Sequence, residues 1–294
     1  MCFLMSLVSS TPLLNEARKN GYGIAAFNIH TLEMLQAIVD AAEESNAPLI
    51  LQTTVGTVKH LGIDYIVAAA ETAAKKARIP IALHLDHCQD FDLIIQCIRA
   101  GYTSVMIDAS MHPFEENVRR TRKVVEVARA LGVNVEAELG KVGGVEDDII
   151  VSEADAMLAV PEECEEFIEL TGVNTLAPAI GTAHGIYKGE PKIDFQRIEE
   201  IAKRVSVPLV LHGGSGIPEG KLMKCVSLGM SKVNIATEIK NTFSESIRQS
   251  FLTNPNELDP RKYMVPAKEA VKKLAIEKLT LCGNIGKANE VTLV

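Results

Sequence analysis

The stretch Pro208-Leu-Val-Leu-His-Gly-Gly-Ser-Gly216 predicts a short buried strand that ends in a glycine-rich turn. Its apolar residues follow one another without alternation, which is typical of a parallel strand covered on both faces. Helical periodicity then runs over Glu219–Leu228. The strand, its polar turn and the covering helix form one β-then-α unit, and the repetition of this unit predicts the fold.

The same unit recurs along the chain from Gly23 onward. Strands are expected at Ile24–Asn28, Pro48–Gln52, Ile81–Asp86, Ser104–Asp108, Asn134–Leu139, Thr175–Ala179, Pro208–His212 and Lys232–Thr237. Helices are expected at Leu32–Ser45, Ile63–Ala77, Phe91–Ala100, Pro113–Leu131, Pro161–Leu170, Phe195–Val205, Glu219–Leu228 and Glu238–Phe251. Eight such units favour an α/β fold of the closed (β/α)8 TIM barrel type over an open doubly wound sheet.

We expect residues 1–294 to form a single domain, with the barrel at about 22–252 and a C-terminal helical extension at about 253–294. Turn signals at Asn254-Pro255 and Asp259-Pro260 separate the two parts. A helix rich in Lys and Glu is expected at Ala267–Lys278.

Composition excludes several classes of protein. With 47% hydrophobic and 23% charged residues the chain is not disordered. Its net charge of −8 and the lack of a basic run argue against nucleic acid as a partner. No stretch approaches the ~20 apolar residues that span a membrane, and Met1–Val8 lacks the features of a signal peptide. Six scattered cysteines without a CxxC pair indicate reduced thiols and a cytoplasmic location. Translation could start at Met1 or at Met5, and the sequence does not decide between them.

Three histidines close expected strands of the barrel. His87, His184 and His212 end the third, sixth and seventh strands or their turns. Active sites of such barrels form where the carboxyl ends of the strands meet, so the three imidazoles could converge on one cation. Each could instead be a hydrogen-bonded strand-end residue, but three at equivalent positions favour a metal site.

Asp86 precedes His87 directly, and neighbouring side chains of a regular strand point to opposite faces. We therefore expect the chain to bend there, so that His87 binds metal while Asp86 addresses the substrate. Asp86 could otherwise orient a histidine. His84 lies on the same face as Asp86 and is expected to be a core residue or a partner of a metal ligand rather than a ligand itself.

Glu136 and Glu138 are two residues apart on the fifth strand, and both are expected to face the barrel interior. Buried carboxylates are costly unless they are paired or bind metal, which favours a functional role. An internal ion pair with a lysine is the alternative, but no lysine lies in the interiors of the neighbouring expected strands.

Glycine-rich turns predict a phosphate site. Gly213, Gly214 and Ser215 follow the seventh strand and Asn234–Thr237 closes the eighth, where barrels bind phosphate with backbone N–H groups. The segment Gly140–Asp148, which is acidic and contains glycines, is expected to be either a solvated loop or a mobile lid that carries a general base.

Motifs from about Tyr22 to Lys268 together resemble one family. They are Ala26-Phe-Asn-Ile-His30, His84-Leu-Asp-His87, Ser104-Val-Met-Ile-Asp-Ala-Ser110, Val135-Glu-Ala-Glu-Leu-Gly140 with Gly143-Gly144 and Glu146-Asp147-Asp148, Ala179-Ile-Gly-Thr-Ala-His-Gly185, Leu211-His-Gly-Gly-Ser-Gly216 and Asn234-Ile-Ala-Thr-Glu238. They resemble class II, metal-dependent ketose-bisphosphate aldolases, and among these the tagatose-1,6-bisphosphate aldolase branch. The resemblance implies reversible cleavage to dihydroxyacetone phosphate and glyceraldehyde 3-phosphate through an enediolate stabilised by one Zn²⁺ per subunit.

The resemblance also implies roles for individual residues. Asp86 is implied to be the proton donor and Glu146 the base. The zinc ligands are implied to be His87, His184 and His212. Glu138 is implied to be an alternative metal ligand, with Glu136 hydrogen-bonded beside it. Substrate-binding positions are Asn28, Gly185, Gly213, Gly214, Ser215, Asn234, Ile235, Ala236, Thr237 and Arg261. Some of these groups in the family also bind a monovalent cation, Na⁺ or K⁺. Arg261 matches an arginine that comes from a neighbouring subunit, which implies a homo-oligomer, either a dimer or a tetramer. Some members of the tagatose branch also need a helper subunit.

Other functions remain open at this point. Fructose 1,6-bisphosphate is the second candidate substrate, although Val145 and Ala236 replace acidic residues of the fructose branch. Another phosphorylated keto sugar is the third candidate. A zinc hydrolase is disfavoured by the HxxH spacing at the third strand, and a sugar-phosphate sensor without activity is disfavoured by the presence of both Asp86 and Glu146.

Overall fold

The computed structural model describes residues 6–146, 149–152, 156–187 and 189–291. Asp147, Asp148 and the two candidate start residues, Met1 and Met5, lie outside the described residues.

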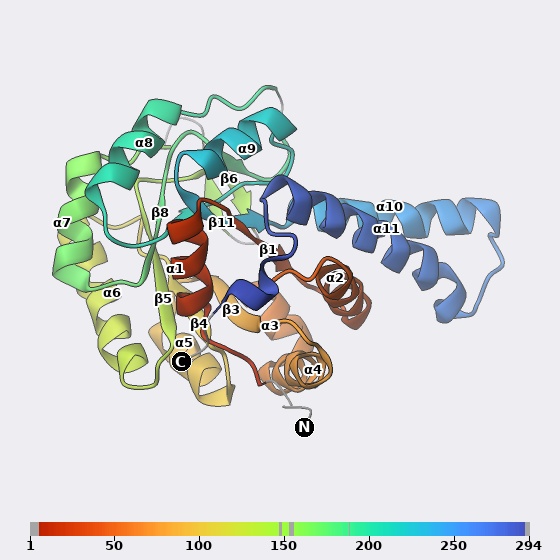
Figure 1. Cartoon of the computed structure of the whole chain (residues 1–294). Coiled ribbons are helices and arrows are strands. Elements are labelled where there is room, and N and C mark those ends of the chain that lie inside the picture. The colour runs from red at the N-terminus through yellow and green to blue at the C-terminus, as the bar shows by residue number, and fades with distance from the viewer. Residues whose placement is uncertain (1–5, 147–148, 153–155, 188, 292–294) are drawn as a thin grey trace.

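Eight parallel strands close into a barrel in the order β1-β11-β10-β8-β5-β4-β3-β2 (Figure 1). Their bounds are β1 Ile24–Asn28, β2 Leu49–Thr54, β3 Ile81–Cys88, β4 Ser104–Ile107, β5 Asn134–Leu139, β8 Thr175–Pro178, β10 Leu209–Leu211 and β11 Met230–Ile235. β1 pairs with β11 from Ile24 opposite Lys232 onward, and this pairing closes the barrel. The predicted TIM-barrel fold is confirmed.

Helices surround the barrel on its outside (Figure 1). The predicted ones are α2 Leu32–Glu44, α4 Ile63–Lys76, α5 Phe91–Ala100, α6 Phe114–Arg129, α7 Pro161–Thr171, α8 Phe195–Arg204, α9 Glu219–Ser227 and α10 Thr237–Thr253. Polar residues begin several of them: Thr31 accepts the N–H of Met34 at 3.2 Å, and Asp194 accepts that of Arg197 at 3.0 Å. Such caps satisfy N–H groups that have no partner inside the helix.

The sequence did not predict two further helices, α1 Ser10–Asn20 and α3 Val55–Leu61, or the short 3-10 helix η1 Lys287–Glu290. Helix α1 precedes the first strand and packs Leu13 and Leu14 against Ile24 and Ile50 of the barrel interior. It therefore covers the end of the barrel where the strands begin, opposite the end expected to carry the site.

Helix α11 Pro260–Leu281 is longer than the helix predicted at 267–278. It runs beside α10, and the two project together from the barrel (Figure 1). Ala267, Val271, Ala275 and Leu279 of α11 are fully buried and belong to the main hydrophobic core. The part of α11 from Ala267 to Leu279 is thus packed into the core of the protein.

The segment Gly140–Asp148, expected to be a loop or lid, contains one strand, and a second strand follows it directly. β6 Gly143–Glu146 pairs antiparallel with β7 Ile149–Val151 and parallel with β9 Ala183–His184. Strands of two to four residues that include paired glycines show no clear alternation of polar and apolar residues, so the sequence pattern does not reveal them.

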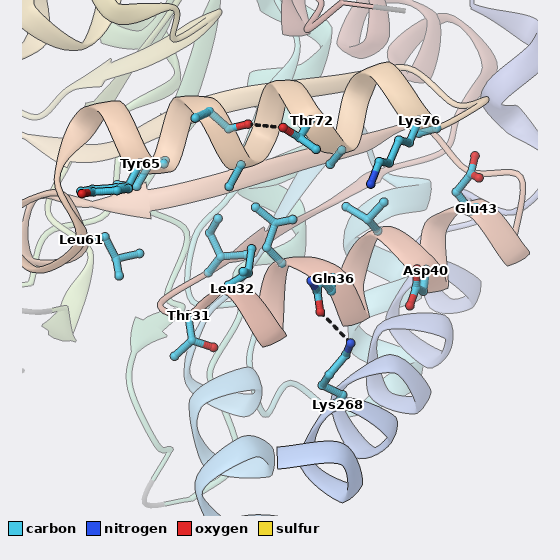
Figure 2. A pocket seen from close by; sticks show the side chains of 18 residues that line it. Thr31, Leu32, Gln36, Asp40, Glu43, Leu61, Tyr65, Thr72, Lys76 and Lys268 are labelled. Atoms are coloured by element: carbon cyan, nitrogen blue, oxygen red, sulfur yellow. Dashed lines mark hydrogen bonds between the residues drawn. The ribbon is translucent and has the colours of Figure 1, made fainter. Parts of the chain in front are cut away.

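A groove of about 830 Å³ lies on the outside of the barrel between α2 and α4, with Lys268 of α11 at its edge (Figure 2). Lys268 donates to Gln36 at 2.7 Å, and Tyr65 at the other end of the groove is exposed. The groove is lined by helices and lies apart from the strand ends. Among the described residues, no helix is long and apolar enough to cross a membrane.

Candidate active site

Three imidazoles meet at the carboxyl end of the barrel. His87 is the last but one residue of β3, His212 follows β10, and His184 lies on the short strand β9 that follows β8. The ring of His87 lies 4.7 Å from that of His184 and 4.6 Å from that of His212, measured between centroids. One ligand nitrogen from each of the three lies within 4.8 Å of those of the other two, which is close enough for a shared metal ion.

The expected bend at Asp86 and His87 is present. His87 has a backbone φ of 47°, in the left-handed region that residues with a side chain rarely adopt. The pairing of β3 with β4 also shifts in register between Leu85 and Cys88. Both side chains are buried at the same end of the barrel, so this distortion lets two consecutive residues contribute to one site.

Carboxylates orient two of the imidazoles. His87 Nδ1 lies 2.9 Å from Asp108 Oδ2, and His212 Nε2 lies 2.9 Å from Glu136 Oε1. If these nitrogens carry the protons, His87 Nε2 and His212 Nδ1 keep free lone pairs, and both are buried without a hydrogen-bond partner. Glu138 Oε2 is likewise buried without a hydrogen-bond partner, and it lies 3.5 Å from His212 Nδ1. Such unsatisfied atoms are what a metal would complete.

The charges at the site also fit a cation. Burial, together with the positive charge of His87, keeps the pKa values of His184 and His212 well below 6.5, so both are neutral. Burial also disfavours a charged His87, but the carboxylates of Asp86 and Asp108 outweigh it and raise the pKa of His87 to about 10. Burial, reinforced by Asp108, raises the pKa of Glu138 to about 8. The carboxylates thus favour a positive charge at the centre of the histidines.

The expectation that Glu136 has no lysine partner is wrong. Lys232 Nζ on β11 lies 2.8 Å from Glu136 Oε2 across the barrel interior, and 3.4 Å from His84 Nε2. Lys232 belongs to the eighth strand rather than to a neighbour of the fifth, so inspection of adjacent strands missed it. His84 also contacts Ser104 at 2.6 Å and is fully buried, and with Asp86 and Glu136 it forms a second group that could hold a metal ion.

Amide groups hold the carboxylate of Asp86 from both sides. Asn28 donates to one of its oxygens at 3.0 Å and Asn234 to the other at 3.3 Å. Gln52 in turn donates to Asn28 at 2.9 Å. Sequence reasoning gave no role to Gln52, which lies inside β2, or to Asp108, which follows β4 and was noted only as part of a motif, because neither has a distinctive spacing.

A small pocket joins the predicted substrate positions. Its lining residues are Asn28, Asp86, His184, Gly185, Gly213, Ser215, Asn234, Ala236 and Thr237. Ile235 faces the core instead and is fully buried, while Gly214 hydrogen-bonds through its N–H to the carbonyl of Asn234 at 3.1 Å.

The turn that contains Gly181 and Gly185 and the turn that contains Gly213 and Gly216 are linked to each other. A Cβ on Gly213 would lie only 2.3 Å from the carbonyl oxygen of Ala183, so the backbones are in close contact. The hydroxyl of Tyr187 accepts the N–H of Ala183 at 3.0 Å and donates to the carbonyl of Gly213 at 2.8 Å. Tyr187 was not among the predicted site residues, because a lone tyrosine in a loop has no pattern that distinguishes it.

Two further predicted residues come from elements outside the barrel strands. Glu146 is the last residue of β6, whose neighbour in the sheet carries His184. Arg261 lies in the first turn of α11, is 89% exposed and pairs with Asp259 at 2.9 Å. Within one chain, Arg261 is therefore not part of the pocket.

A family model described as class-II fructose-bisphosphate aldolase matches residues 8–287. The chain belongs to the class-II fructose-bisphosphate aldolase family. Aldolases of this class are lyases that depend on a metal, which agrees with the buried cluster of His, Asp and Glu.

Relatives of this aldolase share its full length. A "probable fructose-bisphosphate aldolase" of Bacillus subtilis (strain 168) is 47% identical over 287 residues, which are 97% of this chain and 100% of the relative. Among solved structures, the YdjI aldolase of Escherichia coli K12 is 35% identical with a TM-score of 0.86, covering 96% of this chain and 99% of the other. A candidate fructose-1,6-bisphosphate aldolase of Coccidioides immitis is 32% identical with a TM-score of 0.88, covering 95% and 97%. The tagatose branch is not confirmed by these similarities.

Proposed function

We propose that this aldolase cleaves D-tagatose 1,6-bisphosphate reversibly to dihydroxyacetone phosphate and glyceraldehyde 3-phosphate. The observation that carries the proposal is the convergence of His87, His184 and His212 beside the carboxylate of Asp86, at a pocket bordered by glycine-rich turns. Ligands for a cation, a group that can transfer a proton and a site for phosphate thereby lie together.

In this proposal His87, His184 and His212 hold a Zn²⁺ ion, and Glu138 is an alternative ligand. The cation supplies Lewis-acid stabilisation for the negative charge that develops next to the ketone when the C–C bond breaks. The hydrogen bonds to Asp108 and Glu136 fix the ring orientations of His87 and His212, so that the ligand atoms are already in place.

Asp86 transfers the proton at the oxygen of the aldehyde product. Both of its carboxylate oxygens accept amide hydrogen bonds, from Asn28 and Asn234, which orient the group toward the pocket that they share. Glu146 is the proposed base for the proton of dihydroxyacetone phosphate, and the pairing of β6 with β9 brings its backbone to the same end of the barrel as His184.

The phosphate of the dihydroxyacetone moiety is assigned to the turns that contain Gly185, Gly213, Gly214 and Ser215, and to Asn234–Thr237 at the start of α10. Backbone N–H groups there can bind an anion, and a monovalent cation, Na⁺ or K⁺, is proposed beside them. Arg261 is proposed to reach the distal phosphate of a neighbouring subunit in a homo-oligomer. Its exposure and its distance from its own pocket agree with that role.

Fructose 1,6-bisphosphate is the second candidate substrate, because the Bacillus subtilis relative is named for it. The two sugars differ in configuration at C4 only. Ala236, where the fructose branch has an aspartate, favours tagatose 1,6-bisphosphate.

The test is cleavage of both bisphosphates in parallel by the metal-replete enzyme, with and without a chelator, followed by triose-phosphate release. Chelator-sensitive turnover with a preference for the tagatose epimer is expected. Preference for fructose 1,6-bisphosphate would reassign the substrate, and turnover that resists complete metal removal would reject the proposed chemistry.

A further inference from the structure

The first turn of α10 carries a charge pair that joins the pocket to the C-terminal helix. Lys278 of α11 is 4% exposed and donates from Nζ to Glu238 Oε1 at 2.9 Å. Glu238 is the second residue of α10 and follows Thr237, which lines the pocket. A residue 40 positions further along the chain therefore contacts the element to which we assign phosphate binding.

Ser215 fixes the same turn from another direction. Its hydroxyl oxygen accepts the N–H groups of Ala236 at 3.1 Å and of Glu238 at 3.3 Å. Ala236 is the residue that precedes the helix, and its side chain cannot cap the helix itself. The position of this turn thus depends on Ser215 from the turn after β10 and on Lys278 from α11.

The carboxylate of Glu238 presents a problem for an anion site. It places a negative charge one residue from Thr237, and its Oε2 is buried without a hydrogen-bond partner. The Glu238 side chain is 27% exposed and does not itself line the pocket, so solvent weakens its repulsion of a phosphate bound at Thr237 but does not remove it. Lys278 is the cation that offsets it, since its second carboxylate neighbour, Glu277 at 3.4 Å, is half exposed to solvent.

We propose that Lys278 is a positioning residue for phosphate binding. It neutralises Glu238 and holds the first turn of α10, so that the turn accepts the phosphate of the substrate. The inference rests on the proposed function, because it concerns the phosphate end of a ketose bisphosphate.

The test compares Lys278→Met, Glu238→Gln and the double variant, with kcat and KM from cleavage and the affinity for inorganic phosphate from calorimetry. Lys278→Met should raise KM and the phosphate dissociation constant by roughly five- to tenfold with kcat within about twofold, because an unpaired charge is left beside the anion. The double variant should recover most of this loss, since it removes the repelling charge as well. A purely structural pair would lower the melting temperature of Lys278→Met and leave its phosphate dissociation constant at the wild-type value.

Lys272→Met is the matched control. Lys272 lies on the same helix and pairs with Glu44 of α2 at 2.7 Å. Its loss should therefore leave KM and the phosphate dissociation constant unchanged. Wild-type phosphate affinity in Lys278→Met, with or without a lower melting temperature, would overturn the proposal. A double variant that binds phosphate as weakly as Lys278→Met would overturn it too.

Two further outcomes distinguish a variant that fails to fold from a failure of the proposed function. If Lys278→Met does not fold, Glu238→Gln alone still tests the idea, because phosphate should then bind at least as tightly as in the wild type, and weaker binding would contradict it. If the wild type cleaves neither bisphosphate, the proposed function fails, while calorimetry with inorganic phosphate still decides the role of Lys278.

Discussion

Lys232 Nζ lies 2.8 Å from Glu136 Oε2 in the barrel interior, where both side chains are 1% exposed. The other oxygen of Glu136 contacts His212, so a lysine on β11 is connected through a carboxylate to a proposed metal ligand. Isolated charges are very unfavourable in such a place, and each member of the pair depends on the other.

Replacement of Lys232 by Met should lower the free energy of unfolding by about 3–5 kcal/mol, because Glu136 is left as an uncompensated buried carboxylate. Urea denaturation measures this loss. Lys203→Met is the control: Lys203 pairs with Glu199 at 2.7 Å on the surface, and its loss should change stability by at most about 1 kcal/mol. Equal effects of the two variants would show that the interior pair contributes no more than a surface one.

Asp108→Asn should weaken metal binding by about 10- to 100-fold, because the hydrogen bond that orients His87 loses its charged acceptor. Competition against a chelator of known affinity measures the change directly. Asp90→Asn, at the start of α5 outside the cluster, should leave metal affinity unaltered. Wild-type affinity in Asp108→Asn would mean that His87 needs no such partner to bind the metal.

Asp86→Ala should reduce cleavage by about 10²- to 10⁴-fold, the range for loss of a general acid or base, and should still retain the metal. His184→Ala should lose both activity and metal. Metal analysis of the two purified variants beside their kinetics separates these roles. Loss of metal from Asp86→Ala would assign Asp86 to the metal ligands instead.

Gly213→Ala should destabilise the protein and weaken binding of inorganic phosphate. The residue has a φ of 65°, and a Cβ would lie 2.3 Å from the carbonyl oxygen of Ala183. Strain at one such position costs roughly 1–3 kcal/mol. Gly220→Ala is the control, since a Cβ there meets nothing within 4 Å and alanine favours the helix in which it lies. Thermal unfolding and phosphate calorimetry on both variants test the prediction.

Sequence reasoning could predict the barrel and the convergence of His87, His184 and His212, because both depend on regular spacing. Strand and helix patterns repeat, and strands of a parallel barrel all end on one side. The bend at His87 also followed from local geometry, since Asp86 and His87 could not otherwise share a site.

Contacts across the barrel could not be predicted in the same way. The Lys232–Glu136 pair joins two strands that are not neighbours in the barrel, and no local pattern fixes such a distance. Tyr187 reaches Gly213, and Lys278 reaches Glu238, through one hydrogen bond each to a segment distant in the sequence. Helix α1 precedes the first strand, so the β-then-α repeat gave no reason to expect it.

The pairing of β6 with β9 places Gly144 opposite His184, where a Cβ on Gly144 would come within 2.1 Å of the histidine carbonyl oxygen. Glu146 stands two positions further along, roughly 7 Å at the usual rise of a strand. The register of β6 against β9 therefore fixes the distance between the backbone of Glu146, the proposed base, and that of His184, a proposed metal ligand. An insertion or deletion between positions 144 and 146 would change this interval.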